Sequence, residues 1–518
     1  MDSGTATSTS LDAVRRSDKW QRISPASVIY FVLKFVSAVI QNGLSAIAPV
    51  AAVLATAGEN RWLILGSIAA GASVLLLIGA VLSFLNFKFR INKDAVLIRS
   101  GVLKRKRLTL SFDRIQNVAF REPIYFRPLS LVILTIESAG STSEEVNLAG
   151  IPRPLAEEIR RFVLERAKTV SANRDIPEQT TNTETSDTGP VVDLLRQPVG
   201  ELVRYGLSNN NVWVFAGIAA GATSQIDEFW DSAFMGSLFD MVGETIGTGI
   251  AAIVTFIIFI AVVVLVLLMG ASIIGSIIVN YRYHLTYHDG RYHRTRGLFE
   301  RQETSVPEVK VQSLKISQPM IAKLLNRFHL TFNQVGFEGK QVPSKKSKFI
   351  VPSVQIPFYE SLTGRLFEDT KVLKQPLDAI SGKFITRHVV YSFGIPAALV
   401  SIPWVLNIGW AGLFPLLLPL VALPFVVLRK RRYGYAMDGE NGVIQRGLIG
   451  HTLTVFPFHK VQTIKISQSP GQRSSGYADL KVKLAGHSLT VPYMKLEDAR
   501  AWRAAALHKV RTSTKAWM

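Results

Sequence analysis

Apolar residues along this chain form three long regions, and polar blocks separate them. A helix needs about 20 mostly apolar residues to cross a bilayer. The first region holds two such runs, 28–57 and 62–85, with a short polar break between them. The third holds two more, joined at Asn407-Ile408-Gly409, and has no charged residue within 389–428. The pattern predicts transmembrane hairpins, each a pair of helices, at 28–85, 202–280 and 388–428.

The second region is the least regular of the three. In its first arm only 212–222 is continuously apolar, which is short for a crossing. Between its arms lie five acidic residues and no Lys or Arg: Asp227, Glu228, Asp231, Asp240 and Glu244. We predict an outer loop there and a membrane crossing at 202–223, because otherwise the basic cluster after the third region would face the outside.

Basic residues flank all three regions. They are Arg15, Arg16, Lys19, Arg22, Lys88, Arg90, Arg204, Arg282, Arg387 and the run Arg429, Lys430, Arg431 and Arg432. Because short cytoplasmic segments of membrane proteins are enriched in Lys and Arg, both termini and every large polar block are predicted to be cytoplasmic.

The polar blocks that follow the three regions repeat one another. In each block a Gly lies fifteen residues before a Gln, a basic residue follows that Gln by eleven, and a second Gly follows it by twenty-four. The three sets are Gly101, Gln116, Arg127 and Gly140; Gly297, Gln312, Lys323 and Gly336; and Gly447, Gln462, Arg473 and Gly486. A spacing kept in three copies indicates a repeated domain.

Alternating polarity around these residues predicts β-strands and tight turns, as at 129–136, 330–335 and 480–484. Helical patterns close the first and third blocks at 155–167 and 496–507, and 357–367 is the candidate in the second. Antiparallel strands closed by one helix outline a pleckstrin-homology-like (PH-like) β-barrel or sandwich. The predicted fold is therefore membrane α plus β, with six transmembrane helices in three hairpins, each followed by a PH-like domain.

The predicted domain order alternates membrane and polar parts. It runs from a cytoplasmic N-terminal segment (1–27) through hairpin 1 (28–85), domain 1 (86–168), a polar linker (169–198), hairpin 2 with its acidic outer loop (202–280), domain 2 (281–378) and hairpin 3 (388–428) to domain 3 (429–511).

The repeated motif resembles that of the bacterial PH-like membrane proteins of the YdbT type. The matching residues are Gly101-Val102-Leu103 with Ile115-Gln116, Gly297-Leu298 with Val311-Gln312, and Gly447-Leu448 with Val461-Gln462. The first copy has Arg99 where the others have Thr295 and Gln445, so that basic position is not uniform. The resemblance covers nearly the whole chain and implies paired membrane helices alternating with PH-like domains at the bacterial cytoplasmic membrane. It implies a location more than an activity.

Composition narrows the functional classes. The 518 residues carry a net charge of +21, which suits anionic lipid, nucleic acid or a cytoplasmic membrane face. Aromatic residues interleaved with Lys or Arg on a stacking face are not evident, so we expect no nucleic-acid partner. The chain has no Cys, which excludes disulfides and Cys-based metal or nucleophile chemistry.

Two groups of candidate site residues emerge from the motif. Its Gly and Gln residues are interpreted as structural, for turns and for buried hydrogen bonds within strands. The basic residues near it are a candidate anion-binding face for lipid headgroups, or else ordinary positive-inside charge. This face comprises Arg99, Lys104, Arg105, Arg107, Arg127, Arg296, Lys323, Arg446 and Arg473.

No motif points to catalysis, a metal or a cofactor. His284, His288 and His293 flank a turn, yet they lack a recognised ligand spacing and the other copies lack these histidines. Three hypotheses remain: a non-enzymatic scaffold that binds anionic lipid headgroups, a peptide or a partner protein, in envelope maintenance or defence; a transporter or channel component with regulatory PH-like domains; and a lipid enzyme. The scaffold is favoured, because transport usually needs ionisable groups inside the helix bundle and no catalytic signature is present.

Overall fold

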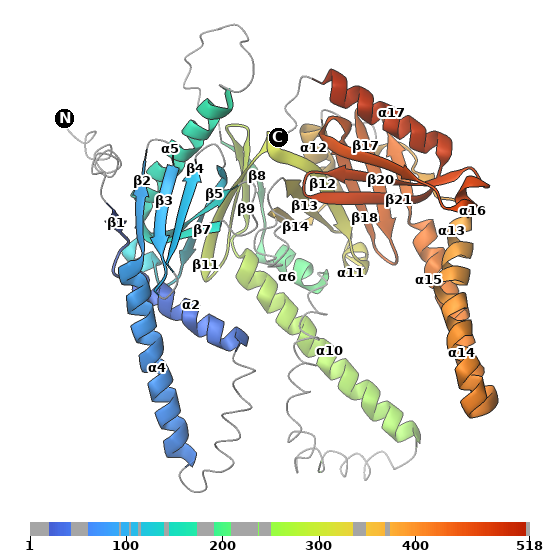
Figure 1. Cartoon of the computed structure of the whole chain (residues 1–518), viewed down its shortest axis with the longest axis horizontal. Coiled ribbons are helices and arrows are strands. Elements are labelled where there is room, and N and C mark those ends of the chain that lie inside the picture. The colour runs from blue at the N-terminus through green and yellow to red at the C-terminus, as the bar shows by residue number, and fades with distance from the viewer. Residues whose placement is uncertain are drawn as a thin grey trace.

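The computed structural model of the chain is drawn in Figure 1. It describes residues 20–42, 61–92, 95–102, 105–111, 115–138, 145–172, 191–208, 237, 250–334, 349–367 and 373–513.

Three helical segments among these residues are long and apolar enough to cross a membrane: Trp62–Asn86, Val254–Asn280 and Lys383–Arg431. The first lies in α4 (Arg61–Asn86) and the second in α10 (Ile250–Asn280). The third is built from α13 (Lys383–Thr386), the π-helix η6 (Arg387–Gly394), α14 (Ile395–Ile408), η7 (Gly409–Leu417) and α15 (Leu418–Arg431). The chain reverses at Gly409, whose φ is 63°, so α14 and η7 lie side by side.

Long apolar helices are thus confirmed in all three predicted regions, whereas the arrangement of six helices in three hairpins stays a prediction. The apolar helix α2 (Ser27–Asn42) is only 16 residues long, and the rest of 28–57 lies outside the described residues. The first arm of the second region opens with α6 (Val199–Ser208). The run 212–222, the acidic residues after it and most of the linker lie outside the described residues.

Each repeated block folds as a four-stranded sheet, a three-stranded sheet and a closing helix. Unit 1 consists of β1 (Gln21–Arg22), β2 (Lys88–Ile91), β3 (Ala95–Ser100) and β4 (Lys106–Ser111), then β5 (Ile115–Pro123), β6 (Leu131–Ser138) and β7 (Glu145–Pro152), then α5 (Arg153–Ala172). Unit 2 consists of β8 (Val192–Arg196), β9 (His284–His288), β10 (Arg291–Arg296) and β11 (Glu300–Pro307), then β12 (Val311–Gln318), β13 (Phe328–Gln334) and β14 (Phe349–Val354), then α12 (Ile356–Leu366). Unit 3 consists of β15 (Asp378–Ala379), β16 (Gly434–Met437), β17 (Asn441–Gly447) and β18 (His451–Pro457), then β19 (Val461–Ser467), β20 (Tyr477–Leu484) and β21 (His487–Lys495), then α17 (Leu496–Thr512).

The first strand of each unit precedes its apolar region in the sequence. β1 pairs with β2, β8 with β9 and β15 with β16, so every membrane region is an insertion between two neighbouring strands of one sheet. The two ends of each membrane region are therefore held by the same sheet. These strands could not be predicted from a periodic pattern in the sequence, because the longest has five residues and the other two have two residues each.

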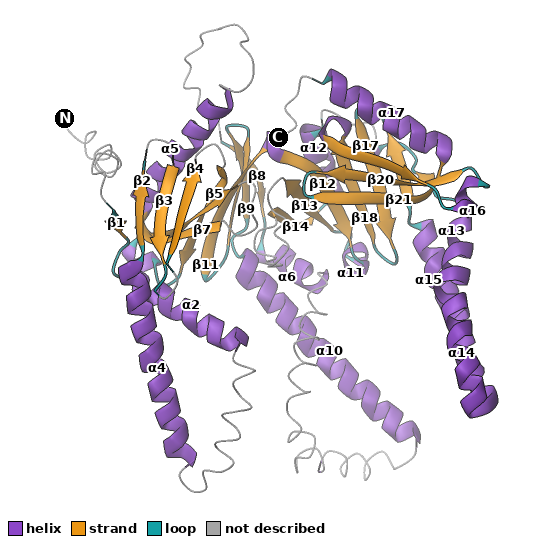
Figure 2. Cartoon of the chain, in the orientation of Figure 1, coloured by secondary structure: helices purple, strands orange, loops and turns teal. Residues whose placement is uncertain are grey.

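The sheets run on from one unit into the next (Figure 2). β5 of unit 1 pairs with β11 of unit 2, which makes a seven-stranded sheet, and β12 of unit 2 pairs with β18 of unit 3 in a second one. We call these two contacts the junctions. The two junctions share one register. Arg121 lies opposite Gln302 in the first junction. Ser317 and Thr452, which occupy the same positions of the repeat as Arg121 and Gln302, lie opposite each other in the second. The three units therefore form one β array.

Each unit buries a core between its two sheets and its closing helix, and the core of unit 2 also includes Ala436, Val443 and Val455 of unit 3. In unit 3 the inward side chains of β20 are fully buried, and Trp502 of α17 packs edge-on to Phe458 with ring centroids 5.5 Å apart. The membrane helices α4, α10 and α14 all leave from one side of the array, and α5 and α17 lie toward the opposite side (Figure 1).

Candidate membrane-facing site

The turn after each motif Gly sits at the end of the array from which the membrane helices leave. In unit 2, Gly297 N–H donates to the carbonyl of Tyr281 and Leu298 N–H to that of Ile278, both at 2.9 Å. Ile278 lies in the last turn of α10 and Tyr281 directly follows the helix, where carbonyls have no partner within a helix. The motif turn therefore supplies the hydrogen bonds that end a membrane helix.

Backbone geometry explains the glycine at this turn. Gly297 has a φ of 113°, and a Cβ built on it would lie 2.0 Å from the carbonyl oxygen of Glu300. Gly101 has a φ of 101°, and a Cβ on Gly447 would lie 2.0 Å from the Gly450 oxygen. Only glycine is free of a Cβ clash in such turns.

The same turn also contacts the preceding unit. The amide of Ile124 in unit 1 donates to the Phe299 carbonyl at 2.8 Å, and the Arg127 guanidinium donates to the Leu298 carbonyl at 2.8 Å. In unit 3, a Cβ on Gly450 would lie 2.5 Å from the Gln318 carbonyl of unit 2. Among the described residues no unit precedes unit 1, and Val102 and Arg105 in its motif turn are exposed.

The basic residues found eleven positions after each motif Gln occupy equivalent short helices. Arg127 lies in η3 (Arg127–Leu129), Lys323 in α11 (Met320–Leu324) and Arg473 in α16 (Pro470–Arg473). Strand pairing places η3 and α11 beside the motif turns of the following units, because β5 and β12 end where β11 and β18 begin. We call the three motif turns and these three short helices the rim.

Exposed apolar side chains stand among the basic ones on the rim. Leu324 is 79% exposed, Phe299 52% and Ile449 51%. Exposure of such large apolar side chains to water is unfavourable, and their burial would lower the free energy. The exposed apolar residues of the rim are Val102, Leu129, Phe299, Met320, Leu324, Leu448 and Ile449. Apolar side chains mixed with Lys and Arg, on the side that meets the membrane helices, suit the headgroup region of a bilayer.

The predicted anion-binding residues differ in their exposure and contacts in the structure. Arg105, Arg107, Lys323 and Arg473 are exposed at the rim or the strands that leave it, and Arg446 is half-buried. Arg99 is exposed and makes a cation–π contact with Trp20, with its guanidinium carbon 4.0 Å from the ring centroid. Lys104 lies outside the described residues.

Arg127 and Arg296 are placed differently from the rest. Arg127 bonds across the first junction, and Arg296 is 4% exposed and donates to Asn280 at 3.1 Å. Burial lowers the pKa of Arg296. These two arginines hold protein segments together and do not belong to an exposed face. Their burial could not be predicted from the sequence, because buried and exposed basic residues occur side by side in the motif.

Each motif Gln lies at a β-bulge. The register of the three-stranded sheet shifts between Ile115 and Asn117 in unit 1, and the same shift brackets Gln312 and Gln462 in the other units. A bulge increases the local twist of a strand and redirects its side chains. Gln312 is fully buried and Gln462 is exposed. Gly486 lies in the turn between β20 and β21 with a φ of 94°, and Gly140 and Gly336 lie outside the described residues.

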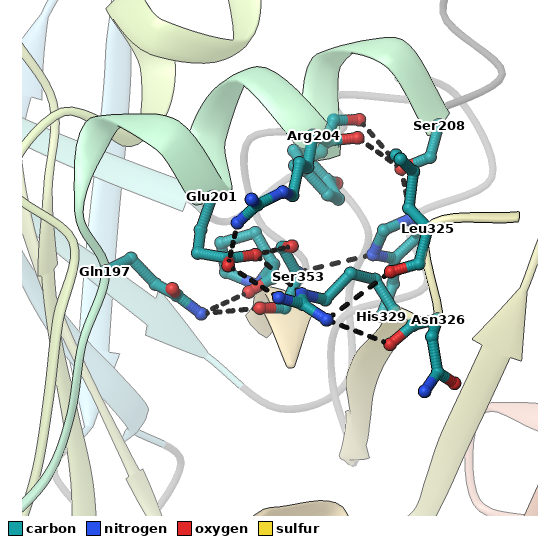
Figure 3. A network of polar contacts seen from close by, with 11 residues as sticks. Gln197, Glu201, Arg204, Ser208, Leu325, Asn326, His329 and Ser353 are labelled. Carbon is teal, nitrogen blue, oxygen red and sulfur yellow. Dashed lines mark hydrogen bonds and ion pairs between the residues drawn. The ribbon is translucent and has the colours of Figure 1, made fainter. Parts of the chain in front are cut away.

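A polar network fixes α6 to unit 2 just before the chain enters the second apolar region (Figure 3). Arg327 donates to both carboxylate oxygens of Glu201, at 2.9 and 3.0 Å, and Ser353 Oγ donates to the same carboxylate at 2.5 Å. Burial raises the pKa of Glu201, but the hydrogen bonds from Arg327 and Ser353 outweigh it and lower this pKa to about 2. Gln197 also donates to the carbonyls of Pro352 and Ser353.

α6 is bound to the base of α10 as well. Ser272 and Ser276 of α10 donate to the carbonyls of Gly206 and Leu202 at 2.7 and 2.8 Å. A Cβ on Gly206 would lie 2.7 Å from Cα of Ile273, so the two helices touch along their backbones. α6 therefore links a membrane helix to the PH-like unit. Most of α6 lies within the segment predicted as hairpin 2 (202–280).

His329 and Ser208 in this network are not arranged for catalysis. Ser353 N–H donates to His329 Nδ1 at 3.3 Å, so the neutral ring carries its proton on Nε2. That nitrogen donates to Ser208 Oγ at 3.0 Å, and Ser208 Oγ donates to the Arg204 carbonyl at 2.7 Å. Burial lowers the pKa of His329 to about 4. A general base must instead accept the serine proton, so this proton arrangement is structural.

The three histidines around the β9–β10 turn have separate contacts. His284 bonds to Asp193 and His288 lies 3.2 Å from an Asp289 oxygen. The rings of His288 and His293 are 6.5 Å apart. Within the part of the chain that the structure describes, no three His, Asp or Glu side chains gather as metal ligands.

Comparisons with known proteins show which proteins the chain is similar to. A family model described as "Bacterial PH domain" matches residues 33–167, 245–362 and 391–510, and its matches end inside α5, α12 and α17. The "UPF0699 transmembrane protein YdbT" of Bacillus subtilis (strain 168) is 24% identical over 495 residues, which cover 92% of this chain and 96% of that protein. No solved structure matches the chain. The resemblance stated from the motifs is confirmed, and the chain belongs to the bacterial PH domain family.

Proposed function

We propose that this protein is a non-enzymatic scaffold of the bacterial cytoplasmic membrane, in which the β array lies on the cytoplasmic face and the rim contacts anionic lipid headgroups. The observation that carries the proposal is the mixture of exposed apolar and basic side chains on the rim, beside the ends of the membrane helices. Membrane helices joined to the array at three separate places would keep this side turned to the bilayer.

Electrostatic and hydrophobic free energies both favour a stable contact between the rim and the bilayer. Each Lys or Arg near an anionic membrane surface contributes about 1 kcal/mol. Full burial of one Leu or Phe side chain contributes about 2 kcal/mol. Because the membrane helices already hold the array at the bilayer, little further ordering is required. A platform of this kind presents its opposite side, with α5 and α17, to the cytoplasm for peptide or protein partners.

The test uses a fluorophore attached to single cysteines in the otherwise Cys-free full chain. We expect a label at Leu324→Cys, on the rim, to be quenched by spin-labelled lipid after reconstitution into vesicles. Quenching should strengthen when anionic lipid replaces zwitterionic lipid, since Lys323 and its neighbours then draw the rim closer.

The matched control is Ser488→Cys, an exposed position near the start of β21. In the β20–β21 pair, Ser488 lies at the end that is far from α16. Its label should remain open to a water-soluble quencher and insensitive to lipid. Equal lipid quenching at both positions, or none at Leu324→Cys, would contradict the proposed orientation of the rim.

A further inference from the structure

The two ends of the β array carry complementary unpaired strands. Each junction joins the first strand of one unit's three-stranded sheet to the last strand of the next unit's four-stranded sheet. At the N-terminal end the strand left over is β4, and at the C-terminal end it is β19. Among the described strands, neither has a partner on its outer edge.

Side chains on these two unpaired strands are more exposed than the equivalent side chains of strands that have a neighbour at a junction. In β12, which has a neighbour at the junction, Gln312 and Ser313 are fully buried and Ile316 is 2% exposed. At the equivalent positions of β19, Gln462 and Thr463 are exposed and Ile466 is half-buried. The same contrast separates Lys106 and Arg107 of β4, both exposed, from their half-buried counterparts in β18.

We propose that β19 of one copy pairs with β4 of a second copy, so that the chain assembles head to tail in the plane of the membrane. The contact repeats the geometry of the two internal junctions. Both have the same register and keep the membrane helices on one side of the array, so a third junction of this kind leaves both copies in one bilayer. Such heterologous contacts close into a ring or continue as a filament.

The register of the repeat specifies the residues that meet. Ser467 takes the place of Ser317 and Lys106 that of Thr452, so these two lie opposite each other. The neighbouring pairs are Gln468 with Arg105, Ile466 with Arg107, and Lys465 with Leu108.

Charge permits this pairing. Lys and Arg on an edge strand commonly discourage association of sheets. Here every basic residue faces a neutral one, and the closest like charges that share a face of the sheet, Lys106 and Lys465, are diagonal neighbours about 7–8 Å apart. Repulsion over that distance is screened at moderate salt.

The experiment mixes two single-cysteine versions of the full chain, Lys106→Cys and Ser467→Cys, with different affinity tags in the same vesicles at moderate salt. Both positions are exposed, and the protein has no other cysteine. Residues directly opposite in antiparallel strands lie about 4.5–5.5 Å apart between Cα atoms, within reach of a disulfide. Oxidation should give a cross-linked dimer that carries both tags.

Two controls isolate the register and the direction of the contact. Thr109→Cys, three residues along β4, should cross-link with Ser467→Cys at least about tenfold less, because it lies about 10 Å along the strand from position 106. Lys106→Cys alone should give no dimer. Absence of the mixed dimer, or equal yields with the shifted or the like-with-like pair, would overturn the proposal.

Discussion

Replacing Arg327 by Met should release α6 from unit 2 and destabilise this attachment by about 3 kcal/mol, the usual cost of removing one partner of a buried ion pair. The side chains of Arg327 and Glu201 are both 14% exposed, and Met fills much of the arginine stem without its charge. The carboxylate would keep Ser353 and the exposed Arg204 but lose both hydrogen bonds from the guanidinium. Protection of the α6 amides against hydrogen exchange should therefore fall about a hundredfold.

The pH dependence gives a second readout of the same pair. The pKa of Glu201 is lowered from 4.5 to about 2 in the folded protein, so the unfolded chain binds more protons in this range. The stabilisation is therefore complete above pH 4.5 and is lost as the pH falls toward 2, by up to about 3 kcal/mol. Glu201→Gln should flatten this part of the pH profile.

Arg301→Met is the matched control for Arg327→Met. Arg301 pairs with Glu303 at 3.3 Å, but its side chain is 47% exposed. Loss of such a surface pair should cost less than about 1 kcal/mol. If both variants leave the α6 amides equally protected, the Glu201–Arg327 pair does not hold this helix.

Replacing Gly297 by Ala should disrupt the turn that ends α10 and cost at least about 3 kcal/mol. The residue would need a backbone conformation that costs an L-amino acid about 1–3 kcal/mol. Its Cβ would also lie 2.0 Å from the Glu300 oxygen, so the turn must move away from Tyr281 and Ile278 and lose two hydrogen bonds. Hydrogen exchange of the Leu298 amide measures this loss directly.

Gly290→Ala separates the cost of the backbone conformation from the cost of the close approach of Cβ to another atom. Gly290 also has a positive φ, 64°, but a Cβ there meets no atom within 4 Å. We expect it to cost about 1 kcal/mol, from backbone conformation alone. Equal losses for the two variants would mean that the close approach at Gly297 contributes nothing.

The sequence predicted most of what is local or repeated. The motif predicted the turn at Gly297, because a turn demands particular backbone geometry from a few adjacent residues. It placed Gln312 within a strand but did not predict the β-bulge that the structure shows there. The closing helices were predicted at 155–167, 357–367 and 496–507, and the structure extends the first and third by a few residues at their ends.

What the sequence could not predict depends on contacts between distant segments. β1 and β15 have two residues each, too few for a periodic pattern, and they form only because a longer strand lies beside them. Arg296 looked like a surface charge until its neighbours in space were known. The junctions could not be predicted, because a strand that pairs with a neighbouring unit has the same sequence pattern as any other strand.

The central claim is that the three PH-like units form one β array, and cross-linking of the second junction tests it most directly. The variant carries Ser317→Cys and Thr452→Cys in one full chain, with a protease site placed within 335–348. After oxidation in membranes and cleavage, we predict that the two fragments stay joined by a disulfide, because these residues lie opposite each other in β12 and β18. The control pairs Ser317→Cys with Arg446→Cys in β17, one strand farther and about 10 Å away, and its fragments should separate. Separation of the Ser317–Thr452 fragments, or equal cross-linking of both pairs, would contradict the continuous array.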